Sequence, residues 1–211
     1  ELAEGSMKAS IDIIETNAQI EQSILKALLS DVGKTMAKSA KILESKLPPI
    51  IESAIISQPE YTSLVSGRLR EEFGIPDAAS KVEKLLQVWK NVEVNYTKPT
   101  IKGGQIFSKI TIYAIRSDYS DVMRLPAAFQ KTKKGQDLAW LDWLLNQGDK
   151  VIIKQYEIVD GKRNGRAGNK VMKKNVKGKW SVPSSFAGNP NNNWITRSID
   201  SVSSIIERTV E

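Results

Sequence analysis

Apolar positions in the first quarter of the chain follow the spacing of a helix. Between Ser10 and Leu47 they recur at steps of three, four or seven residues, which keeps them on one stripe. The stripe comprises Ile14, Ala18, Leu25, Leu28, Val32, Met36, Leu43 and Leu47. Because a proline pushes the residue before it out of the helical region, Pro48 and Pro49 should end this helix. A second helix is expected over Pro49–Ser57, so residues 8–57 are predicted to form a kinked helical arm.

This stripe has two interpretations. A long amphipathic helix usually packs on the core of its own chain, but a narrow stripe of this length also suits packing on a neighbouring subunit. Both remain open on the sequence alone. The candidates for an assembly interface on the arm are Leu25, Leu28, Val32 and Met36.

Beyond the arm, short helical patterns give way to strands. Gly74 should close the short helices that follow Pro59, and Asp77 is expected to be the N-cap of a helix ending near Asn91. Residues 92–96 and 105–115 are rich in β-branched and aromatic residues on either side of a Gly-Gly turn, which predicts an antiparallel hairpin. A short helix over Asp118–Arg124 and a polar connection over 125–136 should follow.

The last third alternates helix, strand and polar loop. A helix over Asp137–Gln147 and a strand over Val151–Ile158 should lead into a mobile, polar tip over Gly161–Gly168. The elements expected after the tip are short strands at Val171–Lys174 and Lys179–Val182, and a helix from Trp194 to about Thr209 capped by Asn191–Asn193.

Together these elements predict an α+β fold with long N-terminal helices, a central antiparallel β-sheet and a closing C-terminal helix. The predicted core domain covers residues 58–211. Residues 1–6 have the look of an expression scar before Met7, and we leave them out of the interpretation of the fold.

Composition narrows the function. The 211 residues contain no histidine and no cysteine. Serine–histidine–aspartate triads, cysteine nucleophiles and histidine- or cysteine-ligated zinc sites are therefore excluded. We expect no enzyme activity, no catalytic residue, no cofactor and no metal. No apolar run approaches the roughly 20 residues that span a bilayer, and no signal peptide is expected before Met7, so no membrane partner is predicted.

Positive charge is concentrated in one segment. The formal net charge is +7, and residues 160–180 hold eight basic residues against a single acid, so the rest of the chain is neutral overall. We interpret this segment as a basic loop, either a solvated tip or a contact for DNA or an acidic protein. No aromatic residue is interleaved in it, which favours contact with the DNA backbone over base stacking. Its basic residues are Lys162, Arg163, Arg166, Lys170, Lys173, Lys174, Lys177 and Lys179.

Two further groups are candidate sites. Asp118 and Asp121 form an Asp-x-x-Asp pair, and Pro76-Asp77 with the distant Asp160-Gly161-Lys162 loosely resembles a magnesium-dependent nuclease signature. Helix-start charge explains the Asp118 pair better, and helix capping explains Asp77 better. The second group consists of Trp180, Pro183, Phe186 and Trp194, whose aromatic residues flank a Pro/Asn-rich loop. Core and loop packing is the default interpretation of this group, and anchoring of a partner subunit, with Trp180 and Phe186 as the candidates, is the alternative.

The sequence of residues 141–199 resembles that of a known protein family. LDWLLNQGDKVIIKQYEI, GRAGNKVM and KWSVPSSFAGNPNNNWITRSI resemble, in this order, a neck or tail-completion protein of a tailed bacteriophage, and the segment from Ser63 to Ala79 does so more weakly. The resemblance implies a virion component at the head-to-tail junction, made in the host cytoplasm. It also implies a homo-oligomeric ring that contacts other head or tail connector proteins and encloses a channel through which duplex DNA could pass without sequence-specific contact.

Three classes of function therefore stay open. The leading hypothesis is a structural virion protein that works by being assembled. The alternatives are a DNA-binding phage accessory protein that uses the basic loop, and a metal-dependent nuclease. Salt-dependent DNA binding by the isolated protein would favour the first alternative, and magnesium-dependent cleavage would favour the second.

Overall fold

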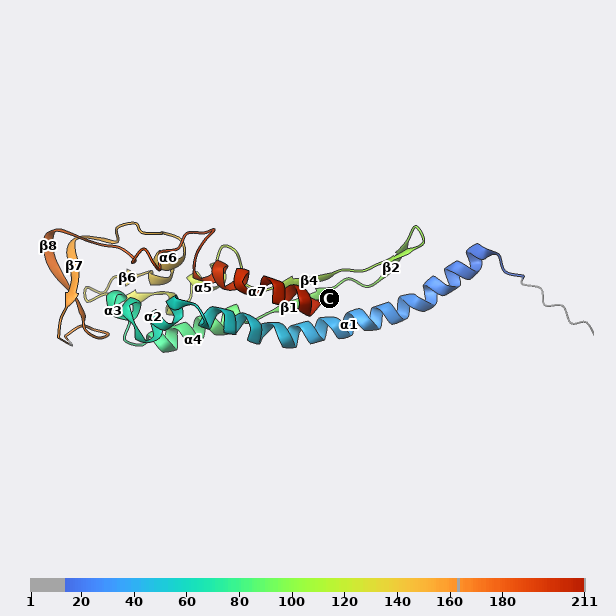
Figure 1. The fold of residues 1–211 in the computed structure, drawn as a ribbon, viewed down its shortest axis with the longest axis horizontal. Helices are drawn as coiled ribbons and strands as arrows, with labels where there is room; N and C mark the ends of the chain where they lie inside the picture. Colours follow the sequence, from blue (N-terminus) through green and yellow to red (C-terminus); the bar gives the residue numbers. More distant parts are fainter. Residues whose placement is uncertain (1–13, 163, 211) are drawn as a thin grey trace, which may run out of the picture. The chain divides into compact units, whose positions relative to one another are not determined.

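The computed structural model describes residues 14–162 and 164–210 and confirms the α+β class (Figure 1). A long helix is followed by short helices, pairs of strands and a closing helix. The helical elements are α1 (Asn17–Ile56), α2 (Pro59–Ser66), α3 (Arg68–Phe73), α4 (Ala78–Trp89), α5 (Ser120–Met123), η1 (Pro126–Ala128), α6 (Trp140–Leu145) and α7 (Trp194–Val210). The strands are β1 (Glu93–Tyr96), β2 (Thr100–Lys102), β3 (Gln105–Phe107), β4 (Ile110–Tyr113), β5 (Gln130–Lys131), β6 (Asp137–Leu138), β7 (Ile153–Asp160) and β8 (Lys170–Trp180).

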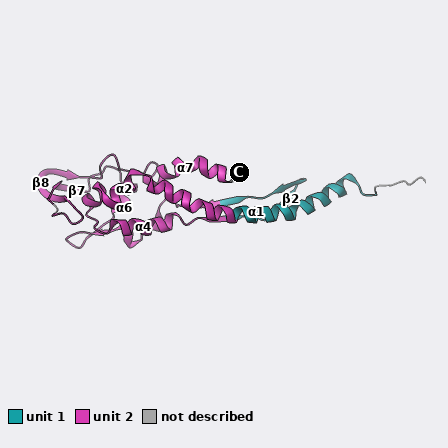
Figure 2. Ribbon diagram, turned by 60° about the horizontal axis from the view of Figure 1, so that its bottom comes forward, with its two compact units in different colours: residues 1–40, 95–111 teal, residues 41–94, 112–211 magenta. Residues whose placement is uncertain are grey.

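The chain divides into two compact units, drawn in different colours in Figure 2. Unit 1 holds the described residues up to Ala40 together with 95–111, and unit 2 holds 41–94 and the described residues from 112 onward. The boundary falls inside α1, whereas the sequence placed it after residue 57. The reason is that the second part of α1 belongs to unit 2 and buries Leu43, Leu47, Ile51 and Ile55.

The prolines do not end the first helix, so the expected break and the separate helix over Pro49–Ser57 are wrong. Pro48 and Pro49 lie inside α1, which continues to Ile56. An internal proline costs roughly 3 kcal/mol because it removes a backbone hydrogen bond and crowds the preceding turn. Leu47 and Ile51, on either side of the pair, are almost fully buried. Burying two such side chains is worth a comparable amount, so packing carries the helix through the prolines.

The start of α1 also differs from the expected Ser10. Residues 14–16 are not helical, and α1 begins at Asn17. The backbone N–H of Gln19 donates to Thr16 Oγ1 (3.3 Å), and the N–H of Thr16 donates to Gln19 Oε1 (2.8 Å). This reciprocal pair is a capping box, which satisfies two backbone donors at the helix start. Residues 1–6 and 10–13 lie outside the described residues.

Three fully buried tryptophans organise the core of unit 2. Trp89 and Trp194 meet edge to face, with ring centroids 5.5 Å apart. The indole N–H of Trp194 donates to the carbonyl oxygen of Ile55 (3.0 Å), and that of Trp140 donates to Ala127 (2.9 Å). Buried indoles that keep a hydrogen bond tie distant segments together, here α7 to the end of α1 and α6 to η1. The other large, fully buried apolar side chains of unit 2 include Leu43, Leu47, Leu64, Leu69, Ile75, Leu85, Leu86 and Leu141.

The closing helix α7 is capped as the sequence predicts. Asn193 Oδ1 accepts the backbone N–H groups of Ile195 (3.0 Å) and Thr196 (3.1 Å), which otherwise lack partners in the first turn. The same oxygen also accepts a hydrogen bond from the hydroxyl group of Tyr119 (3.1 Å). Burial raises the pKa of Tyr119 above its ordinary value, so the phenol stays a donor to Asn193.

Unit 1 consists of the first part of α1 and the tip of a hairpin, which run side by side in Figures 1 and 2. Gly103 and Gly104 both have positive φ (54° and 74°), as a two-residue hairpin turn with right-handed strand twist requires. The register pairs Thr100 with Phe107 and Lys102 with Gln105. The hairpin expected from residues 92–96 and 105–115 is thus confirmed, although it is split into β1–β4 and β2–β3 pairs.

The expected central sheet is instead a set of separate two-stranded pairs. Within the described ranges the pairs are β1–β4, β2–β3, β5–β6 and β7–β8, and the last three are antiparallel. Residues 137–138, expected to open a helix, form β6, and α6 begins at Trp140. In the part of the chain that the structure describes, no helix has both the length and the apolar content for a membrane span.

Candidate functional site: a basic hairpin

The predicted basic loop over residues 160–180 is mostly strand. β8 runs from Lys170 to Trp180 and pairs with β7, so the two short strands expected around residues 177–178 are one element. Cross-strand pairing explains why so polar a segment is extended. Ile158 lies opposite Met172 and Val159 lies opposite Val171, so these four apolar side chains have apolar neighbours across the hairpin.

A bulge bends this hairpin. Lys154 pairs with Lys179 and Tyr156 pairs with Lys174, so residues 175–178 project opposite Gln155 alone. Gln155 has a φ of 64°, which absorbs the change of direction. A Cβ at residue 178 would lie 2.7 Å from the Tyr156 carbonyl group, so only glycine fits there.

Side chains hold the bulge in place. Asn175 Nδ2 donates to Glu157 Oε2 (2.8 Å), while its Oδ1 accepts the N–H of Lys177 (3.1 Å). These two bonds leave Val176 at the top of the bulge with 77% of its surface exposed. The bulge therefore presents an apolar side chain between lysines.

The connection from β7 to β8, where a mobile and polar turn or tip was expected, has turns and bends and packs in part against the rest of unit 2. Ala167 is buried, and Arg166 donates from its guanidinium to the carbonyl oxygen of Lys131. A Cβ at Gly168 would lie 2.3 Å from Glu71 Oε1, so the backbone passes directly against α3. Arg163 lies outside the described residues.

The basic side chains of the hairpin divide into neutralised and free ones. Lys170 forms an ion pair with Asp160 (2.7 Å), and this hydrogen bond raises the pKa of Lys170 above its ordinary value. Lys173 lies opposite Glu157 in the register. The exposed lysines without an ion pair to any described residue are Lys162, Lys173, Lys174, Lys177 and Lys179. Most of the surplus charge thus lies on β8 and its bulge.

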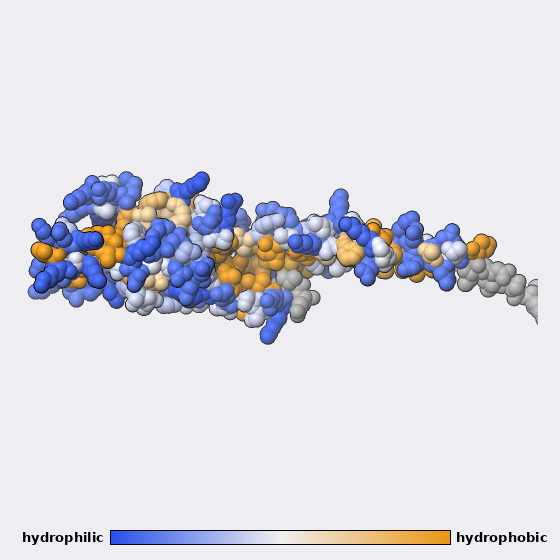
Figure 3. Space-filling view, turned by 90° about the horizontal axis from the view of Figure 1, so that it is seen from above, coloured by the Kyte–Doolittle hydropathy of each residue, from blue (hydrophilic) through white to orange (hydrophobic). Residues whose placement is uncertain are grey.

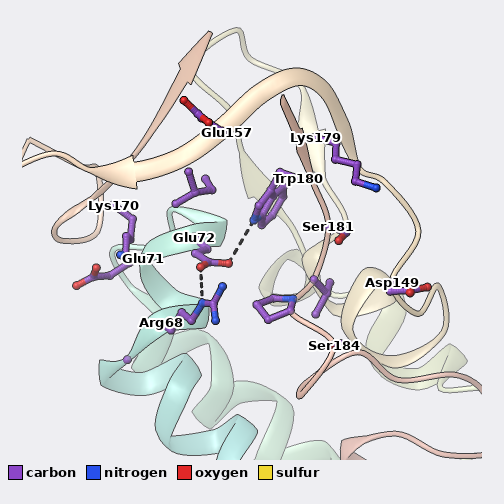
Figure 4. Close-up of a pocket in the computed structure, with 14 residues that line it drawn as sticks. Arg68, Glu71, Glu72, Asp149, Glu157, Lys170, Lys179, Trp180, Ser181 and Ser184 are labelled. Carbon is purple, nitrogen blue, oxygen red and sulfur yellow. Dashed lines mark hydrogen bonds and ion pairs between the residues drawn. The ribbon is translucent and has the colours of Figure 1, made fainter. Parts of the chain in front are cut away.

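A hollow of about 850 Å³ lies beneath the hairpin, between β7, β8 and α3 (Figure 4). Glu72 is buried at its base and accepts hydrogen bonds from Arg68 and from the indole of Trp180 (3.2 Å). The charged residues of the lining are Arg68, Lys170 and Lys179 against Glu71, Glu72, Asp149 and Glu157. Four carboxylates repel a phosphate, so the hollow is a poor anion site and the exposed lysines of β8 are the better one.

Trp180 belongs to this lining as part of the core. It is almost fully buried, and its ring meets Phe73 edge to face at 5.4 Å. Trp180 is the last residue of β8, whereas the sequence predicted a strand over Lys179–Val182. Little of its surface remains for a partner subunit. Phe186 is half-buried.

The aspartates of the nuclease alternative have local roles. Asp118 Oδ1 accepts the N–H of Ser120 (3.0 Å), which lowers the pKa of this carboxyl below its ordinary value. Asp121 Oδ1 accepts the N–H of Val122 (3.0 Å). Among the described residues, no group of three or more acids could hold a metal ion.

The N-cap predicted for α4 is confirmed in its position but not in its side-chain bond. Asp77 occupies the N-cap position and its carbonyl oxygen accepts the N–H of Lys81 (3.1 Å), but its side chain makes no capping bond. The Asp77 carboxylate instead lies 3.9 Å from the Lys81 ammonium group.

On α1 the candidate interface residues differ in exposure. Leu25, Val32 and Met36 are half-buried, whereas Leu28 is exposed. Sequence reasoning missed Ile20 and Ile24, which are also exposed and share a face with Leu28 at steps of four. A second apolar stripe beside the first was the signal that could have revealed them. It also missed Phe107, which is exposed on β3.

Comparison with protein-family models, curated proteins and solved structures returned no match. Functional inference therefore rests on the residues of this chain.

Proposed function

We propose that this chain is a structural protein of a tailed-phage or prophage particle. It is a neck or tail-completion component that forms a homo-oligomeric ring at the head-to-tail junction and contacts other connector proteins there. It is made in the host cytoplasm and then incorporated into the virion. It works by shape and binding, without turnover.

The observation that carries this proposal is the apolar surface of unit 1. Ile24 and Leu28 on α1 and Phe107 on β3 are each about half exposed. In the view of Figure 3, hydrophobic patches interrupt the hydrophilic surface, including the part formed by the first half of α1. Exposed apolar patches mark surfaces that another protein covers. The resemblance of residues 141–199 to neck proteins supports the choice of particle and of position within it.

The basic hairpin supports a second candidate function, non-specific binding of duplex DNA. Lysines 173, 174, 177 and 179 project from β8 without ion pairs to described residues. Lysines spaced along a strand can neutralise phosphates while reading no bases. In a ring the same lysines would line the channel, so the two functions are compatible.

Labelling of the particle tests the leading proposal. An antibody against this protein should bind at the head-to-tail junction of the phage or induced prophage that encodes it, as seen by negative-stain electron microscopy. An antibody against a major capsid protein serves as the control for particle integrity. Protein that is abundant in the lysate but missing from intact particles would contradict the proposal.

The DNA contact has a test of its own. Replacing Lys173, Lys174, Lys177 and Lys179 with glutamine should lower duplex affinity equally for all sequences. The slope of log affinity against log salt should fall by about 0.9 for each phosphate that is no longer neutralised. The matched control replaces the exposed lysines 41, 46, 84 and 133, and it should bind as the unaltered protein does. Unchanged DNA binding together with a failure of particle assembly would instead assign the hairpin to an acidic protein.

A further inference from the structure

One pair of residues in the β7–β8 hairpin brings like charges together. Lys154 lies directly opposite Lys179 in the register of the two strands. Like charges in this position destabilise a hairpin. The pair of Tyr156 and Lys174 holds a single charge, and the remaining pairs join acid to base or apolar to apolar. They are Asp160–Lys170, Glu157–Lys173, Ile153–Trp180, Ile158–Met172 and Val159–Val171.

No carboxylate of a described residue relieves this repulsion by an ion pair. Lys154 and Lys179 are both exposed and form no ion pair within the described ranges. Side chains alternate along a strand, so Lys179 points to the other side of β8 from the buried Trp180. Figure 4 shows the Lys179 side chain directed away from Trp180 and Glu72. The charges of this pair are therefore available to an anion from outside the chain.

The bulge adds a third lysine close to this pair along the chain. Lys177 is exposed and has no ion pair to a described residue. Its backbone N–H donates to Asn175 Oδ1 (3.1 Å), which fixes its position in the bulge. On the other side of the bulge, the acids Glu157 and Asp160 lie opposite lysines in the register. The surplus positive charge of the hairpin is therefore greatest at the end that contains Lys154.

We infer that Lys154 and Lys179 together hold one phosphate group of a duplex DNA backbone. The Cβ atoms of directly opposite residues lie about 4.5–5.5 Å apart, so two long lysine side chains can reach a single anion. Every nucleotide carries a phosphate, so the pair meets one in any register and reads no base. An acidic protein would instead have to place a carboxylate at this one position.

The inference rests on the DNA contact proposed above and names the residues that make it. The sequence analysis did not include Lys154, because this residue lies before the basic segment 160–180 and joins it only through the pairing of β7 with β8.

Salt titrations of duplex binding by the full-length protein test the shared phosphate. Fluorescence anisotropy with two duplexes of unrelated sequence gives the affinity of Lys154→Gln, Lys179→Gln and the double variant. Each single variant should bind both duplexes more weakly, and the double variant should lose roughly tenfold at 0.1 M salt. Its slope of log affinity against log salt should fall by about 0.9, the value for one phosphate, and not by about 1.8. A double variant of the exposed Lys84 and Lys133 to glutamine is the charge-matched control and should bind as the unaltered protein does.

Charge reversal separates binding from folding. Lys154→Glu turns the like-charge pair into an opposite-charge pair, so the temperature of unfolding should stay the same or rise. DNA affinity should nevertheless fall at least as far as in Lys154→Gln. Lys84→Glu makes the same change in net charge on α4 and should weaken DNA binding far less. Thermal unfolding and anisotropy measure the two effects on the same samples.

Three results would overturn the inference while leaving the proposed DNA contact in place. They are unchanged binding by Lys154→Gln, a slope that falls by about 1.8 in the double variant, and equal losses in the Lys154 and Lys84 variants. Displacement of the duplex by polyglutamate at equal charge concentration would assign the pair to an acidic protein instead. An unaltered protein that binds no duplex at low salt would overturn both the inference and the DNA contact. Antibody labelling of the particle is independent of all these results, so the structural role is judged separately.

Discussion

Unit 2 and unit 1 use apolar side chains in different ways. In unit 2, Trp89, Trp140 and Trp194 are fully enclosed, and two of the three indole groups also donate a hydrogen bond to a distant backbone carbonyl. In unit 1, one helix and one hairpin tip form a layer of two elements, and Ile24, Leu28 and Phe107 stay about half exposed. Enclosed side chains stabilise the fold of their own chain, whereas exposed ones are available to another chain. We therefore expect unit 2 to determine the stability of the protein and unit 1 to determine its assembly.

The largest expected effect tests where the boundary between the units lies. Deleting the chain before Lys41 should leave a cooperative thermal transition, because the helical part of unit 2 stays intact. Deleting it before Pro48 also removes Leu43 and Leu47, whose loss costs about 2–5 kcal/mol each. That protein should lack a cooperative transition in scanning calorimetry. If neither shortened protein shows a cooperative transition, residues 17–40 are needed for the core of unit 2.

A core substitution should be far more costly in unit 2 than in unit 1. Trp194→Ala removes a buried ring, its contact with Trp89 and its bond to Ile55, so it should lower the free energy of unfolding by about 3–5 kcal/mol. Phe107→Ala in unit 1 should change it by less than about 1 kcal/mol. Urea denaturation followed by tryptophan fluorescence measures both. Similar losses would mean that Phe107 is part of a core.

The buried ion pair of unit 2 should give the next effect. Glu60 is fully buried and pairs with Arg197, and its second oxygen has no partner among the described residues. Arg197→Met leaves the carboxylate unpaired and should cost about 3 kcal/mol, whereas adding Glu60→Gln should recover part of that loss. The double-mutant cycle is measured by urea denaturation. Additive costs in the cycle would show that Glu60 and Arg197 do not act as a pair.

The smallest effect concerns Asp118. Its pKa is lowered in the folded protein by the bond from Ser120, so its contribution to stability is present above the unfolded pKa and is lost as the pH falls through the folded value. Asp118→Asn should therefore reduce stability slightly at neutral pH and show a smaller loss on acidification. Thermal unfolding across the acidic range measures the difference. A large loss at neutral pH, or a Mg²⁺-dependent nuclease activity that disappears in this variant, would contradict a local capping role.

Elements with strong local signals were predictable. The apolar positions of α4 and α7 keep one face over several turns, the Gly103-Gly104 pair fixes a hairpin turn, and Asn193 caps α7 with its side chain. In each case residues close in sequence supply the energy that decides the structure. Local patterns therefore suffice for these elements.

Features that depend on distant contacts were not predictable. Local rules stop a helix at Pro48, but the burial of Leu47 and Ile51 in unit 2 outweighs them. β8 is rich in lysine and glycine, and it becomes a strand because β7 supplies Ile158 and Val159 across the hairpin. The return of the tip onto α3 depends on Gly168 meeting Glu71, which lies far earlier in the sequence.

The candidate site was predictable in composition and not in geometry. The count of basic residues identifies the segment, but only the fold shows that Lys170 is neutralised by Asp160 while Lys174 and Lys177 remain free of described ion pairs. In the same way, the sequence showed Leu28 as part of one stripe, and the structure assigns it to a second stripe with Ile20 and Ile24.

Disulfide cross-linking tests the account most directly, because the chain contains no cysteine of its own. A variant with both Ile24→Cys and Phe107→Cys, oxidised under mild conditions, should give covalent multimers on a non-reducing gel, because both positions lie on the exposed apolar surface of unit 1 that assembly is proposed to cover. No cross-links from this variant at concentrations where the protein associates would contradict assembly through this surface.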